Sequence, residues 1–228
     1  MSQPFRVWQD VYAIGGPDMS DPSDCCIYMI NTGDLVLIDS GAGESFERLI
    51  DNISTLGFEP QRLKAIIVTH AHIDHIGSLS YFQQKYDVKL IAHELDVPAI
   101  ETGEGTGAEF YGVQYQPCHV DMRLNKAEES LTFGPYELKL IHIPGHTPGS
   151  IAIYVDMDDK RVLFGQDIHG PYISAWGADP AQARLSLQKL IDLKADILCE
   201  GHFGIYQPAS EVKRYIEEYL HQLQRMTS

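Results

Sequence analysis

The chain has 228 residues, of which 44% are hydrophobic and 21% are charged, and this length and composition predict a single globular domain spanning residues 1–228. The composition excludes a disordered chain, a collagen-like repeat and a coiled coil. The net charge of −15 argues against nucleic acid and membrane surfaces as partners, because both are themselves negatively charged.

Short strands and turns are predicted for the first forty residues. Apolar runs predict strands at residues 5–8, 11–14, 25–30 and 35–38, with a hairpin turn at residues 31–34. Apolar residues then recur at helical spacing from Phe46 to Leu56, and Gly57 is a plausible stop for this helix. Strands at residues 64–69 and 88–92 and helices at residues 78–86 and 94–101 follow.

A glycine-rich segment from residue 102 to residue 125 is predicted to be a long loop. Loops of this length inside a compact domain are usually functional, because most connections are much shorter. Phe110, Tyr111 and Tyr115 lie on this segment, and we expect them to form a wall of an apolar substrate pocket.

The second half of the chain repeats the order of the first. Strands are predicted at residues 131–133, 137–143, 150–155, 161–164 and 196–199, and helices at residues 181–193 and 209–224. This order predicts an α/β fold in which two sheets pack together with helices on their outer faces.

The cysteines and the N-terminus indicate the compartment. Cys25 and Cys26 are adjacent, which suits core packing, and the four cysteines form neither a CxxC pair nor a disulfide framework. The N-terminus lacks the pattern of a signal peptide, and the apolar runs are shorter than a membrane span. The sequence therefore predicts a reduced, cytoplasmic protein.

Four metal-binding side chains lie close together directly after a predicted buried strand: His70, His72, Asp74 and His75. His70 and His72 are two residues apart, so in extended backbone both side chains leave the same face. Imidazole and carboxylate are ligands that suit zinc, iron or manganese. The segment therefore predicts a site for one or two metal ions.

Three further candidate ligands follow apolar strands in the second half. His146, Asp167 and His202 each lie next to or near glycine at the end of a strand, where a rigid scaffold can present a ligand. They are expected to complete the coordination that four residues would leave unfinished. His169 follows Asp167 by two residues and is a candidate for the pocket wall. Asp39 either orients a ligand histidine or is an ordinary turn carboxylate.

In this order, the seven candidate ligands resemble the metallo-β-lactamase superfamily of metallohydrolases, and Leu37-Ile38-Asp39-Ser40-Gly41 resembles its earlier acidic motif. The resemblance implies an αββα sandwich of two mixed β-sheets with helices on the outer faces, and metals at one edge between the sheets. It also implies the ligand sets. His70, His72 and His146 would bind the first ion, Asp74, His75 and His202 the second, and Asp167 would bridge them.

Two divalent ions, most simply zinc but with iron or manganese also suitable, would supply the chemistry. Metal binding lowers the pKa of water from 15.7 to about 7, so a metal-bound hydroxide can attack a substrate. Asp74 is expected to orient this water or relay its proton. The motif is similar to that of glyoxalase II-like thioesterases and N-acyl homoserine lactonases. It therefore predicts hydrolysis of an ester, thioester or lactone of a small molecule.

The sequence departs from both of these branches. Thioesterases usually have Thr-Gly-Asp at the bridging carboxylate, whereas this chain has Gly165-Gln166-Asp167, and no basic cluster follows His202. Lactonases place a tyrosine three residues after the bridging aspartate, where this chain has Gly170. Tyr172 lies five residues after Asp167 and is a candidate hydrogen-bond donor in the pocket.

Two other functional classes stay open. A mononuclear iron persulfide dioxygenase would use His70, His146 and Asp167, which form a two-histidine, one-carboxylate set. A non-catalytic metal-binding module is the second alternative, although the complete ligand set argues against it. The oligomeric state is also open, and a homo-oligomer is compatible with the sequence.

Overall fold

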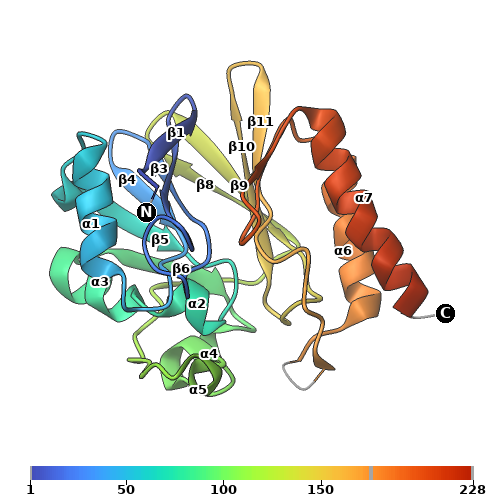
Figure 1. Ribbon diagram of the computed structural model, residues 1–228, viewed down its shortest axis with the longest axis horizontal. Helices are drawn as coiled ribbons and strands as arrows, with labels where there is room; N and C mark the ends of the chain where they lie inside the picture. Colours follow the sequence, from blue (N-terminus) through green and yellow to red (C-terminus); the bar gives the residue numbers. More distant parts are fainter. Residues whose placement is uncertain (1, 175–176, 227–228) are drawn as a thin grey trace. The chain divides into compact units, whose positions relative to one another are not determined.

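The computed structural model describes residues 2–174 and 177–226 (Figure 1). The chain folds into two compact units, one comprising residues 1–125 and 133–135 and the other residues 126–132 and 136–228. Each unit contains one mixed β-sheet with its own helices. The predicted α/β class with two mixed sheets is therefore confirmed, and the predicted single domain stays a prediction.

The first unit is built on a seven-stranded sheet in the order β1 to β7. Its strands are β1 (Phe5–Trp8), β2 (Val11–Gly15), β3 (Ile27–Asn31), β4 (Leu35–Ile38), β5 (Leu63–Ile67), β6 (Lys89–His93) and β7 (Met122–Leu124). Strands β1 to β4 form an antiparallel meander, and β4, β5, β6 and β7 are parallel. The segments that follow the parallel strands therefore begin at one edge of the sheet.

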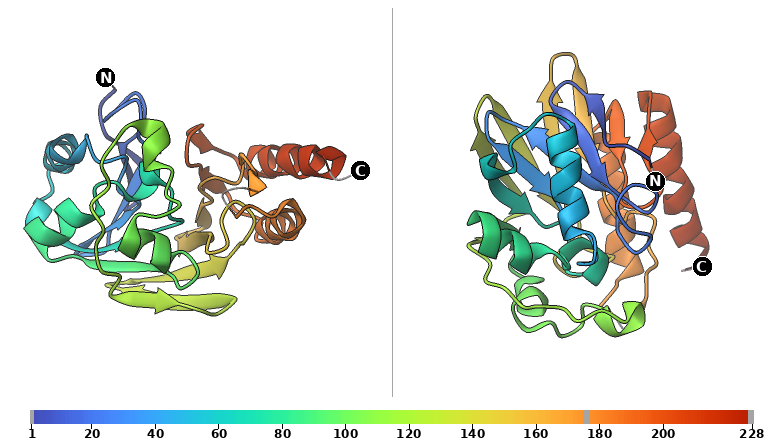
Figure 2. Two further views of the ribbon diagram at one scale, coloured as in Figure 1. Left: turned by 90° about the horizontal axis from the view of Figure 1, so that it is seen from below. Right: turned by 60° about the vertical axis from the view of Figure 1, so that its left-hand side comes forward.

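The connections between the parallel strands are largely helical, as crossovers of this kind require. They comprise α1 (Phe46–Thr55), the 3-10 helix η1 (Pro60–Arg62), α2 (Ile73–Ile76), α3 (Leu79–Tyr86), α4 (Val97–Thr102) and α5 (Ala108–Tyr111). Helices α1 and α3 lie on the same face of the sheet (Figures 1 and 2).

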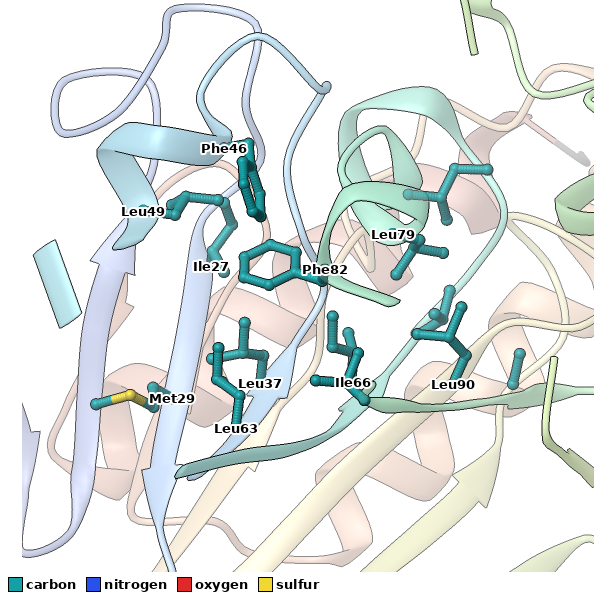
Figure 3. Close-up of a cluster of buried hydrophobic side chains, with 14 of the residues drawn as sticks. Ile27, Met29, Leu37, Phe46, Leu49, Leu63, Ile66, Leu79, Phe82 and Leu90 are labelled. Atoms are coloured by element: carbon teal, nitrogen blue, oxygen red, sulfur yellow. The ribbon is translucent and has the colours of Figure 1, made fainter. Parts of the chain in front are cut away.

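A hydrophobic core joins these two helices to the sheet (Figure 3). Helix α1 forms because Phe46, Leu49 and Ile53 fall on one face at helical spacing, and all three are buried. Phe46 packs edge-on against Phe82 of α3, with ring centroids 4.8 Å apart. Ile66 of β5 lies in the same cluster, so the core holds the strand that precedes the first four candidate ligands.

The second unit is built on a six-stranded sheet in the order β13-β12-β11-β10-β9-β8. Its strands are β8 (Glu128–Phe133), β9 (Tyr136–His142), β10 (Ile151–Met157), β11 (Lys160–Phe164), β12 (Ile197–Cys199) and β13 (Ile205–Tyr206). Strands β11 and β12 are parallel, whereas the pairs β9–β10, β10–β11 and β12–β13 are antiparallel. Helices α6 (Pro180–Asp192) and α7 (Ala209–Met226) lie side by side and pack into this unit's core (Figure 2).

The prediction of one long loop over residues 102–125 was wrong. The segment contains α5 and the edge strand β7, which pairs in parallel with β6. The carboxylate of Asp121 accepts a hydrogen bond from the backbone N–H of Leu90, which fixes the start of this pairing. Pairing with a distant strand supplies the order here, because the three residues Met122–Leu124 are too few to predict a strand by themselves.

No helix in the described part of the chain is long and apolar enough to cross a membrane. Cys25 lies in the hydrophobic core of the first unit, as the sequence predicted, and none of the four cysteines, all of which lie in the described residues, forms a disulfide.

Gly77 generates the first prediction, because it marks a close approach between two backbone segments. Its N–H donates to the carbonyl of Gly41, and a Cβ atom at this position would overlap the carbonyl group of Ala42. Gly77→Ala should lower the free energy of unfolding by about 1–3 kcal/mol or more, as overpacking does. Urea denaturation of the two proteins measures this difference.

Gly57→Ala is the matched control, because no atom lies within 4 Å of its added methyl group and only its φ of +85° opposes alanine. This conformation costs an alanine about 1–2 kcal/mol, without overlap. The interpretation of Gly77 would be contradicted if Gly77→Ala unfolded at the same urea concentration as the wild type.

Candidate metal centre

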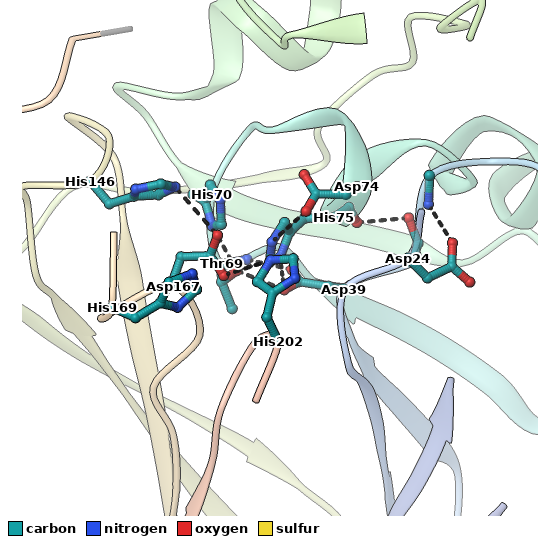
Figure 4. Close-up of polar contacts among 12 residues, drawn as sticks. Asp24, Asp39, Thr69, His70, Asp74, His75, His146, Asp167, His169 and His202 are labelled. Carbon is teal, nitrogen blue, oxygen red and sulfur yellow. Dashed lines mark hydrogen bonds and ion pairs between the residues drawn. The ribbon is translucent and has the colours of Figure 1, made fainter. Parts of the chain in front are cut away.

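Four candidate ligands of the first unit lie at the carboxyl end of β5. His70 follows this strand, His72 is the N-cap of α2, and Asp74 and His75 lie in the single turn of that helix. The ring of His70 lies 4.7 Å from that of His72 and 4.0 Å from that of His75, between centroids (Figure 4 shows His70 and His75). His75 Nε2 lies 3.6 Å from Asp74 Oδ2. The structure therefore brings these four side chains together.

Asp39 connects this cluster to the neighbouring strand β4. It is fully buried, and its carboxylate accepts hydrogen bonds from the N–H of Thr69 at 2.8 Å and the hydroxyl of Thr69 at 2.7 Å. The same carboxylate lies 2.7 Å from His75 Nδ1. A carboxylate at Nδ1 fixes the ring orientation and directs Nε2 toward a metal. This contact is the one expected if Asp39 orients a ligand histidine, and that role stays a prediction.

Asp96, which sequence reasoning missed, anchors the metal-binding loop from the side of β6. It is buried at the N-cap of α4, and its Oδ2 accepts a hydrogen bond from the N–H of Ala71 at 2.9 Å. Ala71 lies between His70 and His72, so Asp96 restrains the backbone that carries both rings. No motif around Asp96 marks this role, since the two residues meet only in the folded sheet.

A buried cysteine lies beside the same histidine. Cys25 Sγ, a carboxylate oxygen of Asp39 and a ring nitrogen of His75 all lie within 4.8 Å of one another. Burial raises the pKa of the Cys25 thiol well above its ordinary value, although the nearby His75 opposes this shift. Cys25 therefore packs as a neutral thiol, consistent with its place in the core.

The three candidate ligands of the second unit converge on one carboxylate. Asp167 follows β11, His202 follows the parallel strand β12, and His146 lies in the turn before β10. Asp167 Oδ2 lies 3.4 Å from His146 Nε2, and Oδ1 lies 3.3 Å from His202 Nε2. Figure 4 shows Asp167 between these two rings. Each oxygen of one carboxylate thus faces a different histidine.

Hydrogen bonds that involve backbone groups fix these histidines. His146 Nδ1 lies 3.0 Å from the carbonyl oxygen of Pro171, which can only accept, so Nδ1 donates and Nε2 is the nitrogen that would bind a metal ion. Glu200, missed by sequence reasoning, is fully buried and accepts hydrogen bonds from the N–H groups of His202 and Phe203 at 2.7 and 2.8 Å. The sequence feature that could have revealed Glu200 is an acidic residue at the end of a buried strand, two positions before the candidate ligand His202.

The predicted pocket residues of the second unit are linked to these ligands. His169 Nδ1 lies 2.6 Å from the Glu200 carboxylate, and the His169 ring is edge-on to that of His202 at 5.3 Å. Tyr172 packs edge-on against His146 at 6.3 Å, and its hydroxyl donates to the carbonyl of Ile168 at 2.7 Å. Burial raises the pKa of the Tyr172 hydroxyl, so it stays protonated.

The three predicted pocket residues of the first unit differ in exposure. Phe110 and Tyr111 lie on α5 and are 67% and 45% exposed. Tyr115 packs against the core of its unit, and its hydroxyl donates to the carbonyl of Ile100 at 3.0 Å. Tyr115 therefore holds the segment onto the core, whereas Phe110 and Tyr111 are exposed, and the pocket role of all three stays a prediction.

The donor atoms fit divalent metal ions. Two ligand atoms bound to one tetrahedral zinc ion at about 2.0–2.1 Å lie roughly 3.3–3.4 Å apart. The separations from Asp167 to His146 and to His202 are 3.4 and 3.3 Å, and the separation within the Asp74–His75 pair is 3.6 Å. All seven candidate ligands offer imidazole nitrogen or carboxylate oxygen, the donor set of zinc hydrolases.

Comparison with known proteins identifies the family. Residues 21–202 match the family model of the metallo-beta-lactamase superfamily. The chain belongs to this superfamily. The family and fold inferred from the ligand motifs are therefore confirmed.

Three similar proteins show how closely this chain resembles known proteins in sequence and in structure. A hydroxyacylglutathione hydrolase of Haemophilus influenzae is 29% identical over 197 residues, covering 84% of this chain and 90% of that protein. A probable metallo-hydrolase of Bacillus subtilis is 30% identical over 145 residues, covering 63% of this chain and 66% of that protein. The structure of a class B3 di-zinc metallo-beta-lactamase from an Alaskan soil metagenome has a TM-score of 0.80 at 25% identity, covering 98% of this chain and 92% of that chain.

The family match, the similar proteins and the clustered histidines and aspartates together establish that this protein is a metal-dependent hydrolase that uses divalent metal ions. The predictions of a metal-dependent hydrolase and of divalent metal ions are therefore confirmed.

Asp39 generates the second prediction. Asp39→Asn keeps a side chain of the same shape but loses the carboxylate that accepts three hydrogen bonds at Thr69 and His75. Losing such a partner of a ligand histidine typically weakens metal binding 10–100-fold. Competition with a chromophoric chelator measures the zinc affinity. Asp34→Asn, an exposed aspartate in the same unit, should bind zinc like the wild type, and equal affinity in both variants would contradict the role of Asp39.

Gly201 generates the third prediction. A Cβ atom at Gly201 would overlap Asp167 Oδ1 and would lie 3.0 Å from Gln166 Oε1. Gly201→Ala should therefore displace the Asp167 carboxylate and weaken zinc binding, by about tenfold or more given the sensitivity of metal sites to their supporting contacts. Gly204→Ala in the same loop is the control, since nothing lies within 4 Å of its added methyl and only its φ of +89° opposes alanine. Unchanged zinc affinity in Gly201→Ala would show that the loop absorbs the methyl.

Proposed function

We propose that this protein is a binuclear zinc hydrolase that cleaves an ester, thioester or lactone of a small molecule. The observation that carries the proposal is the Asp167 carboxylate, whose two oxygens lie 3.4 Å from His146 Nε2 and 3.3 Å from His202 Nε2. A carboxylate that presents one oxygen to each of two ligand histidines is suited to bridging two ions.

In this proposal each ion has three ligands besides the shared carboxylate. The ligands of the first ion are His70, His72 and His146, and those of the second are Asp74, His75 and His202. Because Asp167 is shared between the two ions, the seven side chains leave a position for water or substrate when an ion expands to five-coordinate, as catalytic zinc can. The similar protein from the soil metagenome is described as di-zinc, which supports this stoichiometry.

A thioester is the best-supported substrate bond within the proposal. The relative from Haemophilus influenzae is named for hydrolysis of hydroxyacylglutathione, a thioester. The loop after His202 continues as Phe203-Gly204-Ile205-Tyr206, without the lysines or arginines that would bind the carboxylates of glutathione. We therefore infer an acyl group of related chemistry on a leaving group other than glutathione.

The chain's own residues have distinct roles in this reaction. Bound zinc lowers the pKa of water and polarises a carbonyl oxygen. Asp74 holds its Oδ2 beside His75 Nε2 and accepts a proton from the attacking water at its carboxylate. Asp39 keeps the His75 ring in place through Nδ1. No protein nucleophile is required.

Metal analysis tests the proposal directly. We expect two zinc ions per chain in protein purified without chelators, and loss of thioester hydrolysis when a chelator removes them. Re-addition of zinc should restore turnover, which separates metal removal from unfolding. One iron ion per chain, with oxygen consumption in the presence of a persulfide, would replace the proposal with the dioxygenase alternative.

Asp74 and Asp167 provide the fourth prediction, because the proposal gives them different roles. Asp74→Asn keeps an oxygen ligand but cannot accept a proton, so kcat should fall about 10²–10⁴-fold while metal is retained. Asp167→Ala should instead reduce the metal content. Metal content and turnover are measured on the same preparations, with Asp51→Asn, an exposed aspartate of α1, as the control. Normal turnover in fully loaded Asp74→Asn would remove Asp74 from the mechanism.

A further inference from the structure

A buried carboxylate holds a histidine that is outside the ligand set. Glu200 is fully buried, and its Oε1 lies 2.6 Å from His169 Nδ1. Its other oxygen, Oε2, accepts hydrogen bonds from the backbone N–H groups of His202 and Phe203. The carboxylate that positions the loop of a candidate ligand therefore also fixes the ring of His169 (Figure 4 shows this ring beside Asp167 and His202).

The second ring nitrogen of His169, Nε2, differs from Nδ1 in its hydrogen bonding. The side chain is 13% exposed, and within residues 2–174 and 177–226 the structure shows no hydrogen-bond partner for Nε2. A carboxylate partner keeps the hydrogen on Nδ1, so in the neutral ring Nε2 is an acceptor. His169 thus offers an acceptor of fixed orientation next to the ligand residues.

Two aromatic rings lie close to the His169 ring. The His169 ring lies edge-on to Phe203 at 4.7 Å and to Tyr219 at 6.2 Å, between centroids. Phe203 is 57% exposed although it directly follows the candidate ligand His202. One oriented polar atom beside an exposed apolar ring is the composition of a ligand subsite.

We propose that His169 is a substrate-contacting residue whose Nε2 accepts a hydrogen bond from a hydroxyl or amide N–H of the acyl group, and that Glu200 is the positioning residue that keeps the ring in this tautomer. The inference rests on the proposed function and adds to it a residue that selects the acyl group. Phe203 covers an apolar part of the same group.

Two pairs of thioesters of N-acetylcysteamine test the contact on the zinc-loaded protein. The S-mandeloyl and S-phenylacetyl thioesters differ only in a hydroxyl, and the S-(N-acetylglycyl) and S-(4-oxopentanoyl) thioesters differ only in an N–H replaced by a methylene group. His169→Ala should lower the kcat/KM ratio within at least one pair about three- to tenfold relative to the wild type, the size of one neutral hydrogen bond. Comparing ratios between proteins cancels the intrinsic reactivity of each thioester.

His221→Ala, which removes an exposed histidine on α7, is the matched control and should leave both ratios unchanged. Unchanged ratios in His169→Ala as well would overturn the proposal.

Glu200→Gln gives a result that a purely structural role would not produce. The introduced amide group donates toward His169 Nδ1, so the ring should move its hydrogen to Nε2 and become a donor there. The N-acetylglycyl thioester should then lose its advantage over its methylene analogue, because two donors repel. NMR of the ring nitrogens should show the hydrogen on Nδ1 in the wild type and on Nε2 in the variant. A wild-type ring with its hydrogen on Nε2 would contradict the proposal.

Binding of uncleaved amides separates this inference from the proposed function. Mandelamide should bind the zinc-loaded wild type about three- to tenfold more tightly than phenylacetamide by calorimetry, and His169→Ala should bind both equally. Absence of hydrolysis of all four thioesters would count against the proposed function alone. Equal binding of the two amides by the wild type, together with unchanged ratios, would reject the role of His169 and leave the proposed function standing.

Discussion

The site depends on buried carboxylates that occupy the ends of parallel strands and accept hydrogen bonds from neighbouring segments. Asp39 follows β4 and accepts hydrogen bonds from Thr69 and His75, which follow the parallel strand β5. An ionised carboxylate is costly to bury unless its oxygens are satisfied, and three donors satisfy it here. The same contacts that stabilise the charge therefore fix the backbone and ring that carry metal-binding atoms.

The second unit uses the same arrangement with a different acid. Glu200 follows β12, while Asp167 and His169 follow the parallel strand β11. The Glu200 carboxylate accepts hydrogen bonds from the loop of His202 and from His169. In both units a parallel strand pair brings an orienting carboxylate and a group of polar side chains to one edge of a sheet. This position is rigid, so side chains are held there with little freedom to adopt other rotamers.

Close packing around these carboxylates explains the small residues beside them. Gly201 leaves room for Asp167, and Gly77 lets the turn of α2 approach the loop at Ala42. The loop that approaches α2 also carries Ser40, whose N–H and hydroxyl both donate to the carbonyl of His75. The ligands are therefore supported by neighbours that have no metal-binding chemistry themselves, and small changes in these neighbours reach the site.

The sequence by itself determined most of the helices and strands and the candidate donor set of this protein. Apolar runs predict the buried strands, and the helical spacing of apolar residues predicts α1. Imidazole and carboxylate groups that follow the ends of several strands indicate a metal site, because few other functions need these residues at such positions. Only the tertiary structure decided which groups orient the ligands. Asp96 and Glu200 meet their partners across strands that are distant in sequence, and β7 exists because β6 offers it an edge. Such contacts depend on the register of neighbouring strands and on which ring nitrogen finds an acceptor, and neither is encoded in local spacing.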